Sequence, residues 1–295
     1  MTTVVVIPTY NAGQSLCDLL DGLQTQTLKP AQIIVIDSGS TDETHRIAEQ
    51  RNCKLTTINR IDFDHGTTRN LAMSKVTSEF AIFLTQDAMP ANNYMIAELI
   101  EPMQADSNIA VCYGRQLPRP GAGHLERLAR EFNYPAEPVL KTRKDIDTLG
   151  IKTFFCSNSC SAIRRSIFNK LGGFKNNAIV NEDMLFAAKA ILHDYSVYYS
   201  AKAEVFHSHS YSLLHTFKRY FKIGRFFADN QEILKHAGIK SYGGDMLKTG
   251  VRAFWQERRP QYIIALLIEL IVKAAAFKFG WYYQLSFHKK HDAYL

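Results

Sequence analysis

The sequence predicts an α/β fold, in which a mostly parallel central sheet is flanked by helices and followed by a C-terminal helical extension. Over the first hundred residues, short β-rich runs alternate with amphipathic segments, the pattern of a parallel sheet covered on both faces. Polar turns follow three of these runs, and in open parallel sheets such turns meet at the carboxyl edge of the strands. We therefore expect one cleft at that edge.

Local patterns place the elements of the first half. Leucines at positions 16, 19, 20 and 23 share one helical face and predict a helix. Ser40, with Glu43 three residues later, is typical of a capping box and predicts a helix that begins directly after the turn at 37–40. The predicted strands of this half are Val4–Ile7, Ile33–Ile36, Lys54–Ile58 and Phe80–Leu84.

The second half opens with a segment of weak periodicity. Between Pro118 and Gly150 prolines and glycines interrupt any long element, so we interpret this segment as partly irregular, in the role of a lid or acceptor loop. Beyond it the pattern predicts, in order, a strand at Thr153–Cys156, a helix from Arg165, a turn at Gly172-Gly173, a helix after Glu182 and a strand at Ser196–Phe206.

The chain divides into an α/β domain over residues 1–210, with halves at 1–115 and 116–210, and a helical, basic and aromatic extension over residues 211–295. Tyr262–Phe279 is strongly apolar, but Glu269 and Lys273 keep its uncharged run well short of the ~18 to 20 residues that a spanning helix needs. Two interpretations stay open. The extension covers the domain's own core, or it lies on a membrane or against another subunit.

Charge and cysteine content narrow the class of partner. A net charge of +7 suits an anionic partner such as a nucleotide, a lipid phosphate or a membrane surface, and we expect no nucleic acid partner. The five cysteines are scattered without a C-x-x-C pair, which argues against a disulfide scaffold and a structural zinc site. The first residues carry no basic signal-peptide region, so we expect a cytoplasmic protein.

Two turns of the first half hold candidate nucleotide contacts. Pro8–Asn11, where the first strand opens, places a proline and small polar groups in reach of a flat base or ribose. Asp37 ends the second strand, where its carboxylate suits a nucleobase N–H or a ribose hydroxyl, and Gly39 lets the backbone come close. Capping of the following helix is the alternative role of Asp37.

A third segment also suits a nucleotide. In His65–Asn70 a cation and an amide follow a flexible glycine, which suits a ribose or diphosphate.

Three more side chains suit metal binding and proton transfer. Asp87 follows a buried strand and is placed to bind Mg²⁺ or Mn²⁺, the alternative being a solvated turn aspartate. His207 and His209 follow the last strand, where alternation aims both imidazoles to one side. Glu182 and Asp183 begin a helix, and a carboxylate there serves as a general base or simply stabilises the helix start.

Taken in order, these segments resemble glycosyltransferase family 2, the inverting enzymes of the GT-A fold, from about Val4 to His209. The matching pieces are Val-Ile-Pro-Thr-Tyr-Asn11, Val35-Ile-Asp-Ser-Gly-Ser-Thr-Asp42, Gly66 with Arg69-Asn70, Phe83-Leu-Thr-Gln-Asp87, Arg164-Arg165 with Gly172-Gly-Phe174, Glu182-Asp183 and His207-Ser-His209.

The resemblance implies a role for each matched residue, with the nucleotide sugar bound by residues 1–115 and the acceptor by 116–210. Asp183 would be the catalytic base, and Asp87 with His207 or His209 would bind Mg²⁺ or Mn²⁺. Ser157, Asn158 and Glu182 would contact the acceptor. The nucleotide sugar would be held by Pro8, Thr9, Tyr10, Asn11, Asp37, Ser38, Gly39, His65, Gly66, Arg69, Asn70 and Gln86.

Two departures from the family pattern refine the expectation. Asp37-Ser38 replaces a frequent pair of aspartates, and Thr85-Gln86-Asp87 keeps only the last acid of Asp-x-Asp, which predicts weaker metal binding. Together with Phe63–Gly66 and Cys156–Cys160, these departures resemble bacterial rhamnosyltransferases that use dTDP-L-rhamnose. That branch implies a saccharide or lipid-linked saccharide acceptor at the inner face of the membrane, in the synthesis of a cell-surface polysaccharide such as O-antigen or capsule.

Three alternatives remain for the function. The same fold accepts UDP-hexose donors in many relatives. A dinucleotide-binding dehydrogenase starts with the same elements, but this chain lacks G-x-G-x-x-G after its first strand. A non-catalytic membrane-bound scaffold would not need Asp87, Asp183 and His209 together.

Overall fold

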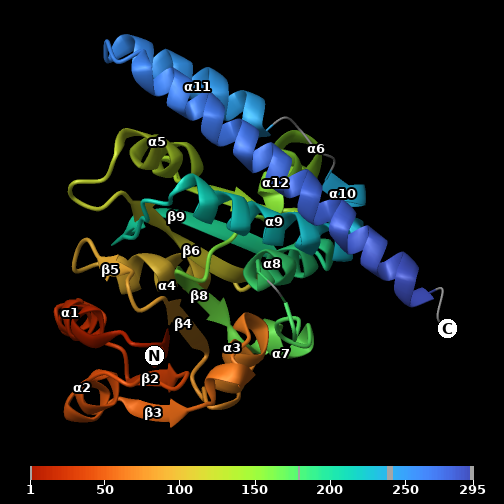
Figure 1. Ribbon diagram of the computed structural model, residues 1–295. Helices are drawn as coiled ribbons and strands as arrows, with labels where there is room; N and C mark the ends of the chain where they lie inside the picture. Colours follow the sequence, from red (N-terminus) through yellow and green to blue (C-terminus); the bar gives the residue numbers. More distant parts are fainter. Residues whose placement is uncertain (1, 179, 238–241, 293–295) are drawn as a thin grey trace.

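The computed structural model describes residues 2–178, 180–237 and 242–292, and within them a nine-stranded sheet forms the centre of the protein (Figure 1). Its order is β3-β2-β1-β4-β8-β6-β9-β5, and β7 also pairs with β9. The strands are β1 (Thr3–Thr9), β2 (Gln32–Asp37), β3 (Lys54–Thr57), β4 (Phe80–Leu84), β5 (Met89–Pro90), β6 (Ile109–Leu117), β7 (Val139–Lys141), β8 (Cys160–Arg164) and β9 (Ser196–Phe206).

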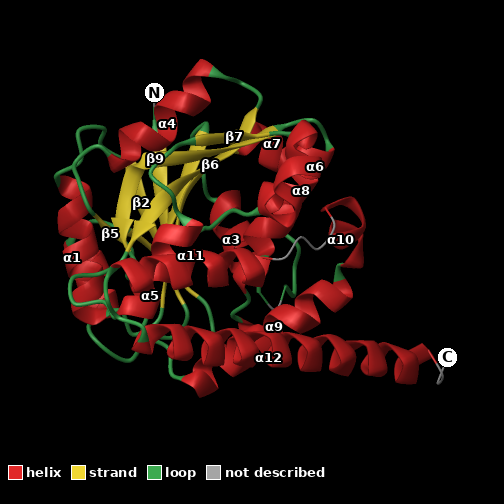
Figure 2. Cartoon of the chain, turned by 90° about the horizontal axis from the view of Figure 1, so that it is seen from above, coloured by secondary structure: helices red, strands yellow, loops and turns green. Residues whose placement is uncertain are grey.

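Helices cover both faces of this sheet (Figure 2). The α-helices are α1 (Gly13–Gln24), α2 (Thr44–Gln50), α3 (His65–Ser74), α4 (Met95–Ala105), α5 (His124–Asn133), α6 (Ile146–Leu149), α7 (Arg165–Lys170), α8 (Glu182–Leu192), α9 (Leu213–Asp229), α10 (Gln231–Ala237), α11 (Tyr242–Gln256) and α12 (Gln261–Asp292). Short 3-10 turns are η1 (Arg60–Asp62), η2 (Arg143–Asp145) and η3 (Gly150–Phe154).

The sheet separates two hydrophobic cores. Val4 and Val6 of β1 face one core, with α3, α7 and α8, whereas Val5 and Ile7 face the other, with α1, α2 and α4. Alternate residues of a strand point to opposite faces, so a strand buried on both sides is apolar throughout. The predicted α/β class is confirmed. The predicted helix with four leucines on one face is α1, and all four leucines are buried.

The sheet is mixed, because β8, β5 and β7 run antiparallel to their neighbours, whereas β6 and β9 pair parallel like the strands of the first half. β3, β2, β1 and β4 run parallel, and β8 then inserts antiparallel between β4 and β6. The predicted strand at Thr153–Cys156 is wrong, because Gly150–Phe154 forms a 3-10 turn and Cys160–Arg164 supplies the strand. Both stretches are short and apolar, and periodicity cannot tell a buried strand from a buried turn.

One further expectation needs correction, and another is confirmed. The capping box at Ser40 and Glu43 does not form, since α2 begins at Thr44, whose N–H is bonded to the Asp42 carboxylate at 3.0 Å. The Ser40 hydroxyl instead accepts the N–H of Asn11 at 2.8 Å. The segment 118–150 is only partly irregular, because it contains α5, β7 and α6, with the prolines lying between these elements.

The C-terminal helices pack against the domain and against each other. α9 and α12 lie side by side, and the far end of α12 extends beyond the rest of the protein (Figures 1 and 2). Gly280 of α12 and Gly224 of α9 make this contact close, because a Cβ on either would overlap backbone of the other helix. Leu128 of α5 shares a small core with Phe254 and Leu266 of the extension. The domain boundary at residue 210 stays a prediction.

The close contact between α9 and α12 predicts a stability effect. A Cβ added at Gly280 would overlap the carbonyl oxygen of Phe221, so we expect Gly280→Ala to lower the free energy of unfolding by about 1–3 kcal/mol. Gly243→Ala, in α11, is the control, because its Cβ would enter open space and should stabilise by about 0.5–1 kcal/mol. Chemical denaturation measures both, and equal effects would contradict the packing role of Gly280.

Candidate active site

Asp37 stabilises the turn after β2. Its carboxylate is fully buried and accepts hydrogen bonds from the Thr9 hydroxyl at 3.0 Å and from the N–H groups of Gly39 and Ser40 at 3.0 and 2.8 Å. Burial alone would raise the pKa of Asp37, but the bonds from Ser40, His45 and Thr9 lower it. Asp37 therefore stabilises the turn and does not cap the following helix, because α2 begins at Thr44 and its N-cap is Glu43. A nucleotide contact by Asp37 stays a prediction.

The loop after β1 is held by side chains from neighbouring strand ends. The amide of Gln86 accepts the N–H of Tyr10 at 2.8 Å and donates to its carbonyl at 3.2 Å. Ser38 is buried and donates to the carbonyl of Thr9, and Asn11 takes a positive φ of 45°. Gln86 and Ser38 therefore shape the backbone of this loop, while their predicted contact with a nucleotide is untested.

Beside the loop after β1, an exposed tyrosine is stacked on an arginine. The guanidinium carbon of Arg60 lies 3.9 Å from the centre of the Tyr10 ring, which is 39% exposed. Such a flat, cationic platform suits a nucleobase. Arg60 was missed by the sequence analysis, because it lies in η1, far from the first strand in sequence, and belongs to no motif.

The predicted glycine and amide of α3 turn out to have packing roles. A Cβ on Gly66 would overlap the carbonyl oxygen of Lys175, so only glycine lets the two segments meet here. Asn70 clamps the next turn of chain, accepting the N–H of Phe174 at 3.0 Å and donating to its carbonyl at 2.9 Å. These contacts position α3, and the role of both residues in holding a nucleotide stays a prediction.

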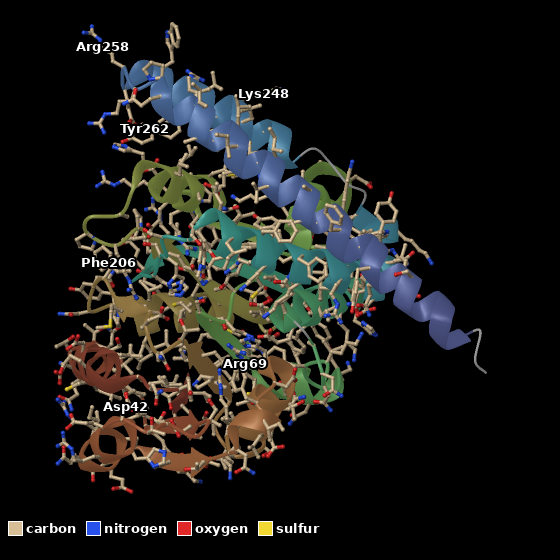
Figure 3. The ribbon with its side chains drawn as sticks, viewed as in Figure 1. Asp42, Arg69, Phe206, Lys248, Arg258 and Tyr262 are labelled. Atoms are coloured by element: carbon tan, nitrogen blue, oxygen red, sulfur yellow. The ribbon has the colours of Figure 1, made fainter. Side chains whose placement is uncertain are left out.

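Arg69 and Glu182 form a buried ion pair at the centre of the site. Their side chains are each 6% exposed, with Nη1 and Oε1 3.0 Å apart (Figure 3 labels Arg69). Glu182 also accepts the side-chain amide of Asn158 at 3.2 Å. The carboxylate of Glu182 is thus engaged below the surface, and its predicted acceptor contact remains untested. Within the described residues the buried Nε of Arg69 has no hydrogen-bond partner.

Asp183 is the carboxylate best suited to accept a proton. It lies in the first turn of α8, where Asp183 Oδ2 accepts the N–H of Asn158 at 3.0 Å. Burial, followed by the negative charge of Glu182, raises its pKa to about 7. A carboxylate with a pKa near neutrality is a better proton acceptor than an ordinary aspartate, because it is more basic and is still about half ionised at neutral pH.

Asp87, His207 and His209 converge into a cluster, as the sequence predicted. The Nε2 atoms of His207 and His209 lie 3.4 and 3.3 Å from the Asp87 carboxylate, and the candidate ligand atoms all lie within 4.8 Å of one another. Burial would raise the pKa of Asp87, but the hydrogen bond and charge of His207 and the charge of His209 lower it. One carboxylate and two imidazoles form a donor set that suits Mn²⁺ and accepts other divalent ions.

The cluster and Asp183 belong to one site, joined by a buried glutamine. Gln116 of β6 accepts from His207 Nδ1 at 2.9 Å and donates to the Ser157 hydroxyl at 2.9 Å. Asn158, which follows Ser157 in the chain, donates its backbone N–H to the Asp183 carboxylate. Ser157 and Asn158 were expected in the site from the sequence. Gln116 was not, because no motif surrounds it and it reaches the site only through the pairing of β6 with β9.

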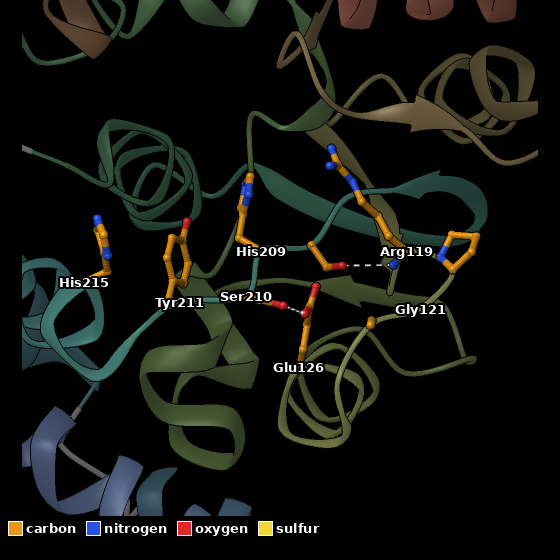
Figure 4. A pocket seen from close by; sticks show the side chains of 10 residues that line it. Arg119, Gly121, Glu126, His209, Ser210, Tyr211 and His215 are labelled. Carbon is orange, nitrogen blue, oxygen red and sulfur yellow. Dashed lines mark hydrogen bonds between the residues drawn. The ribbon is translucent and has the colours of Figure 1, made fainter.

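A pocket of about 470 Å³ opens beside His209 (Figure 4). Its walls come from the loop before α5 and from the segment that joins β9 to α9. Ser210 donates to the Glu126 carboxylate at 2.5 Å, and Tyr211, 46% exposed, presents its ring to the opening. An aromatic ring, a carboxylate and the exposed Arg119 are side chains that suit a polyhydroxylated ligand.

An aspartate with a raised pKa and an Asp-His-His cluster follow the strands and helices of an α/β sheet, an arrangement that fits a glycosyltransferase of the GT-A fold. Comparison with known proteins gives the family. Residues 4–172 match Glycosyl transferase family 2, and the chain belongs to this family.

Two relatives match nearly the whole chain. O-antigen chain rhamnosyltransferase RfbN of Salmonella typhimurium is 41% identical over 287 residues, which are 96% of this chain and 91% of the relative. O-antigen chain rhamnosyltransferase WbaN of Salmonella anatum is 40% identical over 283 residues, 95% of this chain and 89% of the relative.

Solved structures with the same fold are more distant in sequence. The mannosyltransferase PcManGT of Pyrobaculum calidifontis, solved with GDP-Man and Mn²⁺, gives a TM-score of 0.59 at 17% identity, covering 93% of this chain and 73% of the other. Residues 1–349 of S. aureus TarS give 0.57 at 17% identity, covering 98% and 92%. These structures confirm the predicted GT-A fold.

The buried ion pair predicts a strong effect of removing one partner. We expect Arg69→Met to lower the free energy of unfolding by about 3–5 kcal/mol, because it leaves the buried Glu182 carboxylate without its cation. Replacing both residues by methionine should cost less than replacing Arg69 alone. The control is Arg46→Met, in an exposed pair with Glu43, which should cost less than about 1 kcal/mol. Urea denaturation measures all three, and a double variant less stable than Arg69→Met would contradict this interpretation.

Proposed function

We propose that this glycosyltransferase transfers L-rhamnose from dTDP-L-rhamnose to a saccharide or lipid-linked saccharide acceptor, in the synthesis of O-antigen or a related surface polysaccharide. The observation that carries the proposal is the 41% identity, over nearly the full length of both chains, with a protein named as an O-antigen chain rhamnosyltransferase. The clustering of Asp87, His207 and His209 near Asp183 supplies the groups that such a transfer needs.

Asp87, His207 and His209 fit a divalent cation by their chemistry and spacing. Their three candidate ligand atoms lie close enough to share one ion, and the lowered pKa of Asp87 keeps its carboxylate ionised and ready to bind. When bound there, Mn²⁺ or Mg²⁺ would neutralise the charge of the leaving diphosphate. The two imidazoles favour Mn²⁺, and the single carboxylate accounts for the weaker binding that the sequence predicts.

Asp183 would accept the proton of the acceptor hydroxyl. The hydroxyl oxygen forms a bond to C1 of the sugar while the bond from C1 to the diphosphate oxygen breaks, so dTDP leaves and the configuration at C1 inverts. The proton moves to the Asp183 carboxylate, which the N–H of Asn158 holds in place at 3.0 Å. As the family resemblance implies, Arg69 would contribute its positive charge to the binding of the donor, close to its phosphates.

The acceptor saccharide would enter by the pocket beside His209. Tyr211 offers a face for a sugar ring, and Glu126 and Arg119 offer an acceptor and donors for hydroxyl groups. The wall formed by residues 119–126 lies within the segment that the sequence analysis interpreted as a lid or acceptor loop. Tyr10 and Arg60 would stack on the base at the other end of the site.

A screen of nucleotide sugars tests the proposed function. The purified chain is incubated with Mn²⁺ and dTDP-L-rhamnose, UDP-glucose, UDP-N-acetylglucosamine or GDP-mannose, and release of the nucleoside diphosphate is measured with and without a lipid-linked saccharide extract. We expect acceptor-stimulated release from dTDP-L-rhamnose alone. Preference for a UDP sugar would replace the donor assignment with the alternative left open by the sequence.

Asp183→Asn is the matched variant for the same assay. It keeps the size of the side chain but cannot accept a proton, so we expect kcat to fall by about 10²- to 10⁴-fold with little change in donor binding. For the wild type, kcat/KM should rise with pH through a midpoint near 7, because the base acts only when ionised. Full activity of the variant would remove Asp183 from the role of base.

The extension would bind the inner face of the plasma membrane as a peripheral protein. None of the described helices has the length and hydropathy to cross a bilayer. Yet α12 exposes an apolar stripe at Ile264, Leu267, Ile268 and Ile271, and α11 adds the 72% exposed Trp255. Lys248 of α11 and Arg258, in the turn between α11 and α12, lie away from the sheet (Figure 3), and their charge favours anionic lipid.

Vesicle sedimentation tests this membrane contact. We expect the chain to bind vesicles that contain phosphatidylglycerol, and the double variant Ile264→Ser/Ile271→Ser to bind them about tenfold or more weakly, because two exposed apolar side chains are lost. The control is Ile61→Ser, which removes a 92% exposed isoleucine from η1. Unchanged binding of the double variant would contradict the proposal. A wild-type dimer that this variant dissociates would instead show a second copy on the stripe.

A further inference from the structure

Gln116 is a buried polar residue to which neither the sequence motifs nor the comparisons assign a role. It lies one residue before the end of β6, opposite Val205 of β9, and is 2% exposed. An amide at such a depth must satisfy its hydrogen bonds inside the protein. All the partners that the structure gives it belong to the active site or border it.

The orientation of the Gln116 amide is determined by its partners. Arg130 Nη1 lies 2.6 Å from Oε1, and a guanidinium can only donate, so the oxygen must face Arg130. The amide nitrogen then donates to the Ser157 hydroxyl at 2.9 Å. With oxygen and nitrogen exchanged, two donors would face each other at the arginine, which excludes the flipped amide.

This orientation decides which nitrogen of His207 carries a proton. Gln116 Oε1 also lies 2.9 Å from His207 Nδ1. Because that oxygen can only accept, Nδ1 must be the donor and carry hydrogen. In the neutral imidazole the other nitrogen, Nε2, is then free of hydrogen, and it faces His209 Nε2 at 3.2 Å and the Asp87 carboxylate at 3.4 Å.

We propose that Gln116, oriented by Arg130, is a positioning residue that fixes the tautomer of His207 and so prepares its Nε2 to bind a divalent cation. The inference rests on the metal site of the proposed function and deepens it. A ring nitrogen binds metal through its free lone pair, and a hydrogen bond at the opposite nitrogen holds both tautomer and ring direction. His207 is 8% exposed, so little solvent competes for Nδ1.

The other end of Gln116 links the metal cluster to the base. Its amide nitrogen holds Ser157, and the backbone N–H of the following Asn158 binds the Asp183 carboxylate. A shift of His207 on metal binding would therefore pass through one amide group to the loop that holds Asp183. An ordinary structural glutamine would stabilise the protein without any preference for one tautomer or any effect on metal affinity.

The tautomer is tested first in the metal-free wild type. The protein is labelled with ¹⁵N-histidine, treated with EDTA and studied at pH 8 by long-range ¹H–¹⁵N correlation, with His207→Gln to assign the resonance. We expect the Nδ1–H tautomer for His207, and a mixture of tautomers in Gln116→Leu. An Nε2–H tautomer in the wild type would overturn the proposal, whether or not the chain binds metal.

Manganese affinity is the second readout, measured from the EPR signal of free Mn²⁺. Gln116→Leu removes the acceptor, and we expect its Kd for Mn²⁺ to rise about tenfold or more. Gln116→Glu still accepts from Nδ1 and pairs with Arg130, so its affinity should stay within about threefold of the wild type. Gln26→Leu is the matched control, because Gln26 is 1% exposed, its side chain makes three hydrogen bonds, and none of them is to these residues.

The outcomes separate this inference from the proposed function. Wild-type affinity in a folded Gln116→Leu, or an equal loss in Gln26→Leu, would overturn the role of Gln116. If Gln116→Leu does not fold, a loss of tenfold or more in Gln116→Glu would do the same. A wild type that binds no Mn²⁺ would instead reject the metal site of the proposed function, while the NMR result still decides whether Gln116 fixes the tautomer.

Discussion

The active site depends on the position of one strand, because β9 delivers the two histidines to a carboxylate more than a hundred residues away in sequence. β9 lies between β6 and β5, with Phe206 opposite both Leu117 and Met89. Asp87, just before β5, therefore meets the residues that follow Phe206. A partly buried carboxylate is costly unless paired, and the imidazoles of His207 and His209 provide that pairing.

The two acids of the site are driven in opposite directions by their surroundings. When charged, His207 donates a hydrogen bond to Asp87, and the positive charges of His207 and His209 act in the same direction, so the pKa of Asp87 falls and it stays ionised. Asp183 is buried beside the carboxylate of Glu182, so its pKa rises toward neutrality. Arg69 neutralises the charge of Glu182 and so reduces the repulsion between the neighbouring carboxylates of Glu182 and Asp183. The two aspartates thus differ in pKa through their environment alone, and the proposed roles of metal ligand and proton acceptor rest on that difference.

The C-terminal extension completes the site as well as covering the domain. The segment between β9 and α9 supplies Tyr211 to the pocket, and α9 is in turn held by α12 through two glycines that bring the helices together. This close packing uses one side of α12 and leaves its isoleucine stripe exposed. α12 therefore holds α9, which follows the segment that lines the pocket, on one side and presents an apolar surface to solvent on another.

The sequence by itself determined the α/β class, strands such as Phe80–Leu84 and Ser196–Phe206, and the convergence of Asp87 with the histidines, because these follow from local periodicity and ordered motifs. Only the tertiary structure decided the antiparallel strand at Cys160–Arg164, the burial of Glu182 against Arg69, and the bonds of Gln116. Strand order and side-chain partners join residues far apart in the chain, and a pattern within a short window contains no information about which distant surface will meet it.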